Sequence, residues 1–125
     1  MHRGRSPWFD SRDDAADRYL RVSGLTGLLT PNDAAVDAGL REEDGPWRLA
    51  MDPAAFGVGA PDMPRLLAAA RARVTLARGE HDPMVTDEQL AQLRVMRITF
   101  PGLGHNAHVE DPAAVAALLD VWSPR

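Results

Sequence analysis

A chain of 125 residues has the length of one small domain, which buries about 65% of the surface that the unfolded chain exposes. Its composition, 45% hydrophobic and 26% charged, is ordinary for a globular protein and excludes general disorder. The net charge of -4 argues against nucleic-acid binding, and the absence of cysteine excludes disulfides and thiolate chemistry.

Membrane insertion and export are not expected. No apolar run approaches the ~20 residues of a membrane helix, and no signal-peptide segment is present. All 14 basic residues are arginine, which excludes a lysine-based mechanism and is typical of a bacterial-like, high-GC coding bias. We therefore expect a soluble, cytoplasmic protein.

The acidic charge lies in the first half of the sequence. Residues 1–63 carry 7 Arg against 11 Asp and Glu, whereas residues 64–125 carry 7 of each. The Gly- and Pro-rich stretch 56–61 between them is typical of a linker. We expect two parts: a helical segment over 1–63 and an α/β part over 64–125.

Short helices and loops are predicted for the first part. Residues 11–22 form a helix capped by Ser11. Its apolar face is predicted at i, i+4 and i+7, namely Ala15, Tyr19 and Val22. The sequence from Thr30 opens a second helix with a proline at its first position, and Gly39 ends it. Residues 46–51 form a short extended segment, but no sheet of its own is expected here.

The second part alternates helices and strands. The predicted elements are a helix over 65–72 after Pro64, a strand over 74–79, a capping-box helix over 86–93, an edge strand over 95–100 and a final helix from Asp111-Pro112. Val115, Leu118, Leu119 and Trp122 form an apolar stripe on that last helix. Two strands joined by a helix should be parallel, with a right-handed crossover.

Candidate catalytic side chains follow the carboxyl ends of both strands, where functional groups collect in parallel sheets. Asp82 follows the first strand and His105 the second. Because adjacent parallel strands place such loops side by side, the two can touch. An Asp that accepts a hydrogen bond from one imidazole nitrogen leaves the other nitrogen as a general base. The residues alone also allow non-catalytic roles, with Asp82 capping a turn and His105 lying on the surface.

These two motifs in this order, GEHDPMV after one strand and FPGLGHNAHVEDP after the next, resemble the C-terminal third of α/β-hydrolase fold enzymes. The resemblance covers about residues 64–122. It implies that Asp82 is the acid of a catalytic triad and that His105 is its base. Residues 10–60 are similar, more weakly, to the helical cap often inserted before the acid-bearing strand. The fold expected is thus the C-terminal portion of an α/β-hydrolase, preceded by a cap-like segment.

The chain departs from this family at the nucleophile. The family places a Ser or Asp on a strand-to-helix turn of the type G-x-S-x-G. The chain has four serines, Ser6, Ser11, Ser23 and Ser123, and none of them has a glycine at both flanking positions of this pattern. No Asp has both glycines either. The nucleophile and the oxyanion loop are expected before Met1, on a missing or separate N-terminal half. We therefore expect no turnover by this chain alone, and a small-molecule substrate only when the fold is completed. The bond cleaved stays open.

Other interpretations of the same residues remain. Gly102-x-Gly104-x-x-Ala107 matches a dinucleotide fingerprint, but the helix begins too late for the glycines to lie at its start. His105-x-x-His108-x-Glu110 with His81 and Asp82 could be a metal cluster, although the two histidines do not share a helical face. We expect no cofactor and no metal, and expect Glu110 to be a hydrogen-bonding support rather than a second base. The alternative function is a non-catalytic interaction or self-association module derived from a hydrolase.

Overall fold

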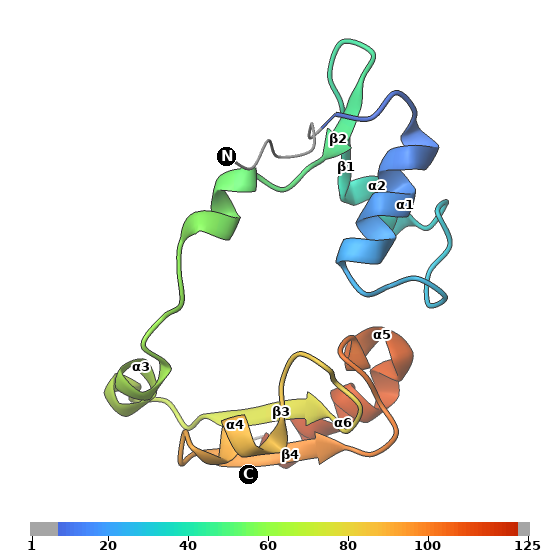
Figure 1. Ribbon diagram of the computed structural model, residues 1–125. Coiled ribbons are helices and arrows are strands. Elements are labelled where there is room, and N and C mark those ends of the chain that lie inside the picture. Colours follow the sequence, from blue (N-terminus) through green and yellow to red (C-terminus); the bar gives the residue numbers. More distant parts are fainter. Residues whose placement is uncertain (1–7, 123–125) are drawn as a thin grey trace. The chain divides into compact units, whose positions relative to one another are not determined.

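The computed structural model describes residues 8–122, with side chains to residue 120. The chain divides into two compact units, Met1–Gly59 and Ala60–Arg125. Figure 1 traces both along the sequence. No helix among the described residues combines the length and the apolar character needed to cross a bilayer.

Two helices supply most of the first unit's buried core, which also includes Leu25 and Leu40. Helix α1, Arg12–Val22, begins as predicted at Ser11, whose Oγ accepts a hydrogen bond from the Asp14 amide at 3.1 Å. Its buried face differs from the prediction. Leu20 lies in the core with Ala15 and Ala16, whereas Val22 is 48% exposed. Because Ala15 and Ala16 are both buried, the buried face of the helix runs along these two positions and Leu20. Val22, the last residue of the helix, lies off this face and is exposed to solvent.

Helix α2 begins later than predicted. It spans Ala34–Ala38, and its cap is Asp33, whose carboxylate accepts from the Ala35 amide at 2.9 Å. The preceding residues form a turn, since the Asp33 amide donates to the Thr30 carbonyl at 3.1 Å. The helix ends at Gly39, as expected, and there a Cβ would collide with the ring of Tyr19. Glycine therefore lets the helix end pack directly on an aromatic ring.

The expectation of no sheet in the first unit was wrong. Strands β1, Leu40–Glu42, and β2, Trp47–Leu49, pair as an antiparallel hairpin. Its turn places Asp44 and Gly45 at positive φ, 55° and 107°. An Asp-Gly pair in such a turn is a strong hairpin signal, but strands of three residues are too short to display the alternation on which the prediction relied.

The end of the first unit is open to solvent. It holds a short 3-10 helix, η1, Pro53–Gly57, in which Phe56 is 77% exposed. Helix α3, Met63–Ala69, follows. It begins two residues before the predicted start because the carboxylate of Asp62 accepts from the Arg65 amide at 3.2 Å.

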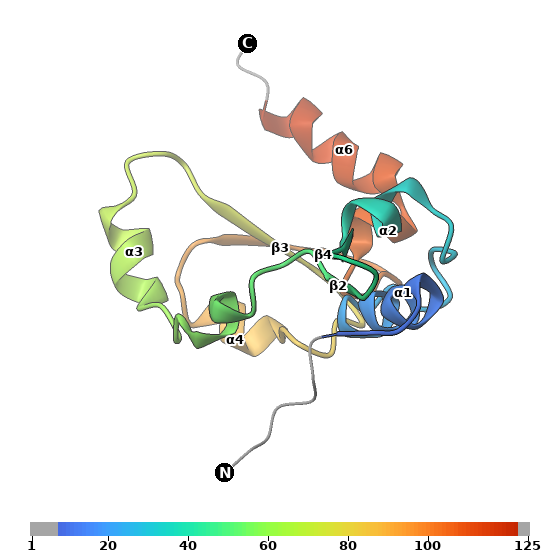
Figure 2. The same ribbon diagram turned by 90° about the horizontal axis from the view of Figure 1, so that it is seen from above.

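A parallel pair of strands organises the second unit, as predicted. Strand β3, Thr75–Gly79, runs beside β4, Met96–Phe100, with Gly79 opposite Phe100. Both views show them side by side (Figures 1 and 2). Helix α4, Asp87–Ala91, connects them and carries the expected capping box of Thr86 and Gln89. The two strands thus end together, at one edge of the sheet.

The final helix begins where it was predicted, and a short helix that was not predicted precedes it. Helix α5, Ala107–Glu110, precedes α6, Pro112–Trp122. Asp111 separates them and caps α6, since its carboxylate accepts from the Ala114 amide at 3.0 Å. On the expected apolar stripe Leu119 is 70% exposed, and the side chain of Trp122 lies outside the described part of the chain.

The second unit has a small core. Leu90 and Phe100 are its buried large apolar side chains among the described residues, each 9% exposed. Several other large apolar groups face solvent: Leu66, Met84, Met96 and Leu119. This unit therefore leaves apolar surface uncovered.

Candidate active site

Asp82 and His105 meet beyond the carboxyl ends of β3 and β4. The Nδ1 atom of His105 lies 3.1 Å from each oxygen of the Asp82 carboxylate. The residues are 23 positions apart in the sequence, so the contact depends on the parallel pairing of the strands. The geometry is that of a carboxylate which orients an imidazole through one ring nitrogen.

The two side chains differ in exposure. The Asp82 side chain is 6% exposed, whereas that of His105 is 43% exposed. Burial raises the pKa of Asp82, but hydrogen bonds from the Met84 amide, from His105 and from the Val85 amide outweigh it, so the pKa is lowered overall. The Met84 contact is 2.8 Å long. The site therefore favours an ionised acid beside an accessible imidazole.

The histidine loop begins with a tight turn after β4. The Leu103 amide donates to the Phe100 carbonyl at 3.4 Å, and Gly102 has a φ of 73°. Proline at the second position and a left-handed glycine at the third are the residues that a type II turn requires. Glu80 stabilises this turn from the other loop, because its Oε1 accepts a hydrogen bond from the Gly102 amide at 3.0 Å.

Glu110 holds the other side of the histidine loop. Its two carboxylate oxygens lie 3.0 and 3.1 Å from the amide nitrogen of Gly104, the residue before His105. A Cβ at Gly104 would lie only 3.1 Å from this carboxylate, so glycine permits the close approach. Glu110 thus makes the supporting contact that we expected of it.

Backbone hydrogen bonds join the loop that follows β3, residues 80–85, to the loop that follows β4, residues 101–106. We call these two segments the acid loop and the histidine loop. The His81 amide donates to the Leu103 carbonyl at 2.8 Å, and the Glu80 amide donates to the Phe100 carbonyl at 3.0 Å. Gly79 allows this contact, since a Cβ there would lie 2.5 Å from the Leu103 carbonyl oxygen. The two loops therefore form one hydrogen-bonded unit.

The same contacts bear on the alternative interpretations. The Gly102 and Gly104 amides, which a bound phosphate would need, already donate to the carboxylates of Glu80 and Glu110. Like charge would repel a phosphate from this loop. Among the described residues, no group of three or more His, Asp and Glu side chains is placed to hold a metal ion. The Nε2 atom of His81 lies 3.3 Å from Glu80, so this histidine does not join Asp82.

Neither of the two serines that the structure describes lies in the unit that holds His105. Ser11 caps α1 and Ser23 follows its end, both in the first unit. Ser6 and Ser123 lie outside the described residues.

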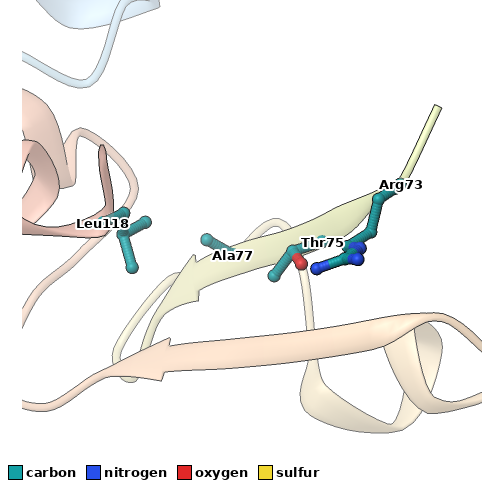
Figure 3. Close-up of a pocket in the computed structure, with 4 residues that line it drawn as sticks. All are labelled: Arg73, Thr75, Ala77 and Leu118. Atoms are coloured by element: carbon teal, nitrogen blue, oxygen red, sulfur yellow. The ribbon is translucent and has the colours of Figure 1, made fainter. Parts of the chain in front are cut away.

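A shallow depression lies elsewhere in the second unit. Figure 3 shows its lining, with Arg73 before the start of β3, Thr75 and Ala77 in β3, and Leu118 in α6. Its volume of about 240 Å³ is below the range of pockets that enclose small ligands, and it includes neither Asp82 nor His105. The hydroxyl of Thr75 is buried there without a hydrogen-bond partner. We assign the depression to incomplete packing between sheet and helix.

Solved structures of hydrolases share this fold. The chain matches an E-2-(acetamidomethylene)succinate hydrolase with a TM-score of 0.70, at 18% identity over 91% of this chain and 46% of that one. It matches an esterase of M. tuberculosis with a TM-score of 0.71, at 22% identity over 98% and 43%. A thioesterase domain from the curacin biosynthetic pathway matches with a TM-score of 0.62, at 21% identity over 92% and 44%. No family model and no curated protein sequence matches this chain.

The predicted fold is therefore confirmed. The chain shares part of the α/β-hydrolase fold with these structures, including two parallel strands and flanking helices. It spans less than half the length of each of these three structures.

Sequence reasoning missed one polar contact of the acid loop. The guanidinium of Arg78 donates from Nε to the Val85 carbonyl and from Nη2 to the Glu80 carbonyl, each at 3.0 Å. A lone arginine inside a predicted strand carries no motif. The only signal in the sequence was a charged side chain directly before a glycine that ends a strand.

Proposed function

We propose that this chain is a C-terminal hydrolase portion that supplies the acid and the base of a catalytic triad to a nucleophile on an N-terminal portion. The observation that carries the proposal is the position of His105 Nδ1, 3.1 Å from both oxygens of a nearly buried Asp82 carboxylate. The fold shared with hydrolases, of whose own chains only 43–46% is covered, supports the need for a second portion.

The mechanism follows from the hydrogen bond. With the Nδ1 proton donated to Asp82, the Nε2 lone pair of His105 takes the proton of a serine hydroxyl as that oxygen attacks an acyl carbon. The imidazolium then returns the proton to the leaving group, and Asp82 stabilises the positive charge in between. If the nucleophile is an aspartate, the same Nε2 deprotonates the water that hydrolyses the ester intermediate.

Esters and thioesters are the first substrates to test, because an esterase and a thioesterase domain are among the structures with this fold. We further propose that the first unit acts as a cap over the completed site. Its position before β3 and the coverage of 91–98% of the chain in the matches support this role.

Complementation tests the function. The full chain is assayed on p-nitrophenyl esters and acyl thioesters, alone and with the polypeptide encoded directly upstream. We expect activity only in the mixture, and we expect Asp82→Asn and His105→Ala to lower it by about 10³-fold or more. His108→Ala and Asp87→Asn are the matched controls, because His108 is an exposed residue of helix α5, just after His105, and Asp87 pairs with Arg97.

Two results would contradict the proposal. Turnover by the isolated chain would mean that the nucleophile lies within it. Activity of the mixture that survives His105→Ala would mean that another group is the base.

A second candidate function is an interaction or self-association module. The exposed Leu66, Met96 and Leu119 favour it, since apolar side chains of this size on one small unit recruit partners. Light scattering after gel filtration separates the two candidates. A mass that grows with concentration, without activity in any mixture, favours the module, whereas a monomer that becomes active with the upstream polypeptide favours the hydrolase.

A further inference from the structure

Arg78 donates hydrogen bonds to both ends of the acid loop. It lies in β3, one residue before Gly79, and its side chain is partly buried. Its Nε atom donates to the carbonyl of Val85 and its Nη2 atom to the carbonyl of Glu80, both at 3.0 Å. These two carbonyls stand on either side of Asp82 in the sequence. One side chain therefore fixes the entrance and the exit of the loop that carries the candidate acid.

The orientation of the Asp82 carboxylate depends on this loop. Its Oδ1 atom accepts from the Met84 amide at 2.8 Å, a contact made two residues along the same loop. If the loop opens between residues 80 and 85, the amide moves away and the carboxylate loses the donor that holds it toward His105. The acceptors of Arg78 are backbone carbonyls, so the contact fixes the path of the chain.

We propose that Arg78 is a positioning residue that holds the 80–85 loop so that the Asp82 carboxylate faces His105. This inference rests on the proposed function, since the orientation matters only if the pair acts in catalysis. Arginine suits the role because its planar fork donates in two directions at once. Lysine keeps the charge, but its donors all lie on one terminal nitrogen, whereas Arg78 donates from two separate nitrogens, Nε and Nη2.

The experiment uses NMR on the full chain, so it needs neither a partner nor a substrate. Arg78→Met removes the donors and keeps much of the aliphatic stem. Arg97→Met is the matched control: it makes the same change in the neighbouring strand, where the guanidinium donates to the Asp87 carboxylate at 2.9 Å. The readouts are the titration of the Asp82 carboxyl carbon, hydrogen exchange of the Met84 amide and the Nδ1 proton signal of His105.

We expect Arg78→Met to raise the pKa of Asp82 toward its ordinary value, because the opened loop no longer holds the Met84 and Val85 amides against the carboxylate, and these donors lower the pKa. Exchange of the Met84 amide should become about tenfold faster, as for the loss of one hydrogen bond. The Nδ1 proton signal should broaden or disappear. Arg78→Lys should behave like Arg78→Met, and Arg97→Met should leave all three readouts unchanged.

Unchanged readouts in a folded Arg78→Met protein would overturn the inference, and so would wild-type behaviour of Arg78→Lys, which would show that charge alone suffices. If Arg78→Met gives no cooperative melt, Arg78→Lys decides by the same readouts. Asp82→Asn separates this inference from the proposed function. If that change leaves the His105 Nδ1 proton signal unaltered, the pairing and the proposed function fail, whereas Arg78 is still judged by the Met84 amide.

Discussion

At the scale of the residue, Asp82 combines burial with a full set of donors. Its side chain is 6% exposed and accepts from the Met84 amide and from His105. Burial alone would raise its pKa and weaken it as a partner for an imidazolium. The loop amides reverse that effect, so the acid stays ionised in the acidic range where an isolated buried carboxyl would take up a proton.

The free energy of unfolding should therefore fall as the pH is lowered through the acidic range in which Asp82 takes up a proton. Because the pKa of folded Asp82 is below the 3.8 of an ordinary aspartate, its ionisation stabilises the fold above that pH. This contribution should be lost as the pH drops through the lower folded-state pKa. Urea unfolding from pH 7 to pH 2 should show wild type more stable than Asp82→Asn at neutral pH and the difference shrinking at the acid end.

Asp33→Asn is a control for this prediction, since Asp33 caps α2 in the first unit and does not contact His105. A difference between wild type and Asp82→Asn that stays constant over the whole range would contradict the lowered pKa.

Some of these residues could be predicted and others could not. Asp82 and His105 follow strands, within motifs typical of a known fold, so sequence alone predicted both. Arg78 acts on backbone carbonyls, and any residue presents a carbonyl, so no sequence pattern marks such a contact. Glu80 is intermediate: an acid after a strand is visible, but its partner, the Gly102 amide, is set by the other loop.

At the scale of the element, the closest contact between the acid loop and the histidine loop is made at the end of β3. Gly79 is buried opposite Phe100, and a Cβ there would clash with the carbonyl oxygens of Leu103 and Gly104. These atoms belong to backbone that is itself held by Glu110 and by the His81 amide. They cannot move aside without breaking those hydrogen bonds.

We therefore expect Gly79→Ala to destabilise the second unit by about 2 kcal/mol or more, as overpacking against rigid neighbours does. Urea unfolding followed by circular dichroism measures the loss. Gly57→Ala is the matched control, because an added methyl group there would meet no atom within 4 Å and the φ of Gly57 is not positive. It should change stability by less than about 0.5 kcal/mol. Equal effects at the two positions would contradict the close approach.

Elements with local signals were predicted well. Ser11, the Thr86 capping box and Gly39 mark helix ends through contacts within a few residues, and the structure has them. The hairpin of β1 and β2 was missed because three-residue strands give no periodicity, and only the Asp44-Gly45 pair signalled it. The start of α2 was misplaced because Thr30 and Asp33 both resemble caps, and only the Asp33 carboxylate reaches a helix amide.

At the scale of the whole molecule, the chain consists of two compact units, and the segment Pro53–Gly57 near the end of the first unit is exposed. Phe56 in this segment is 77% exposed, whereas Phe100 at the end of β4 is 9% exposed. Brief chymotrypsin treatment should therefore cut after Phe56 before it cuts after Phe100, since proteases act on exposed backbone that can unfold locally. Mass spectrometry of the products identifies the order.

Phe56→Ala should slow the first cut and leave the later ones unchanged. Early cleavage after Phe100 would contradict the burial of β4 and would mean that the parallel pair opens readily.

The sequence by itself predicted the class of fold, the order of the elements in the second unit except for α5, and the two residues of the candidate site. These follow from local information: caps, apolar spacing and the motifs after two strands. Only the tertiary structure decided that Asp82 and His105 touch, that Glu80 and Glu110 occupy the glycine amides and that Arg78 spans the acid loop. The cross-loop contacts depend on the register of β3 against β4, a pairing across more than twenty residues. The Arg78 contact depends on the folded path of the loop.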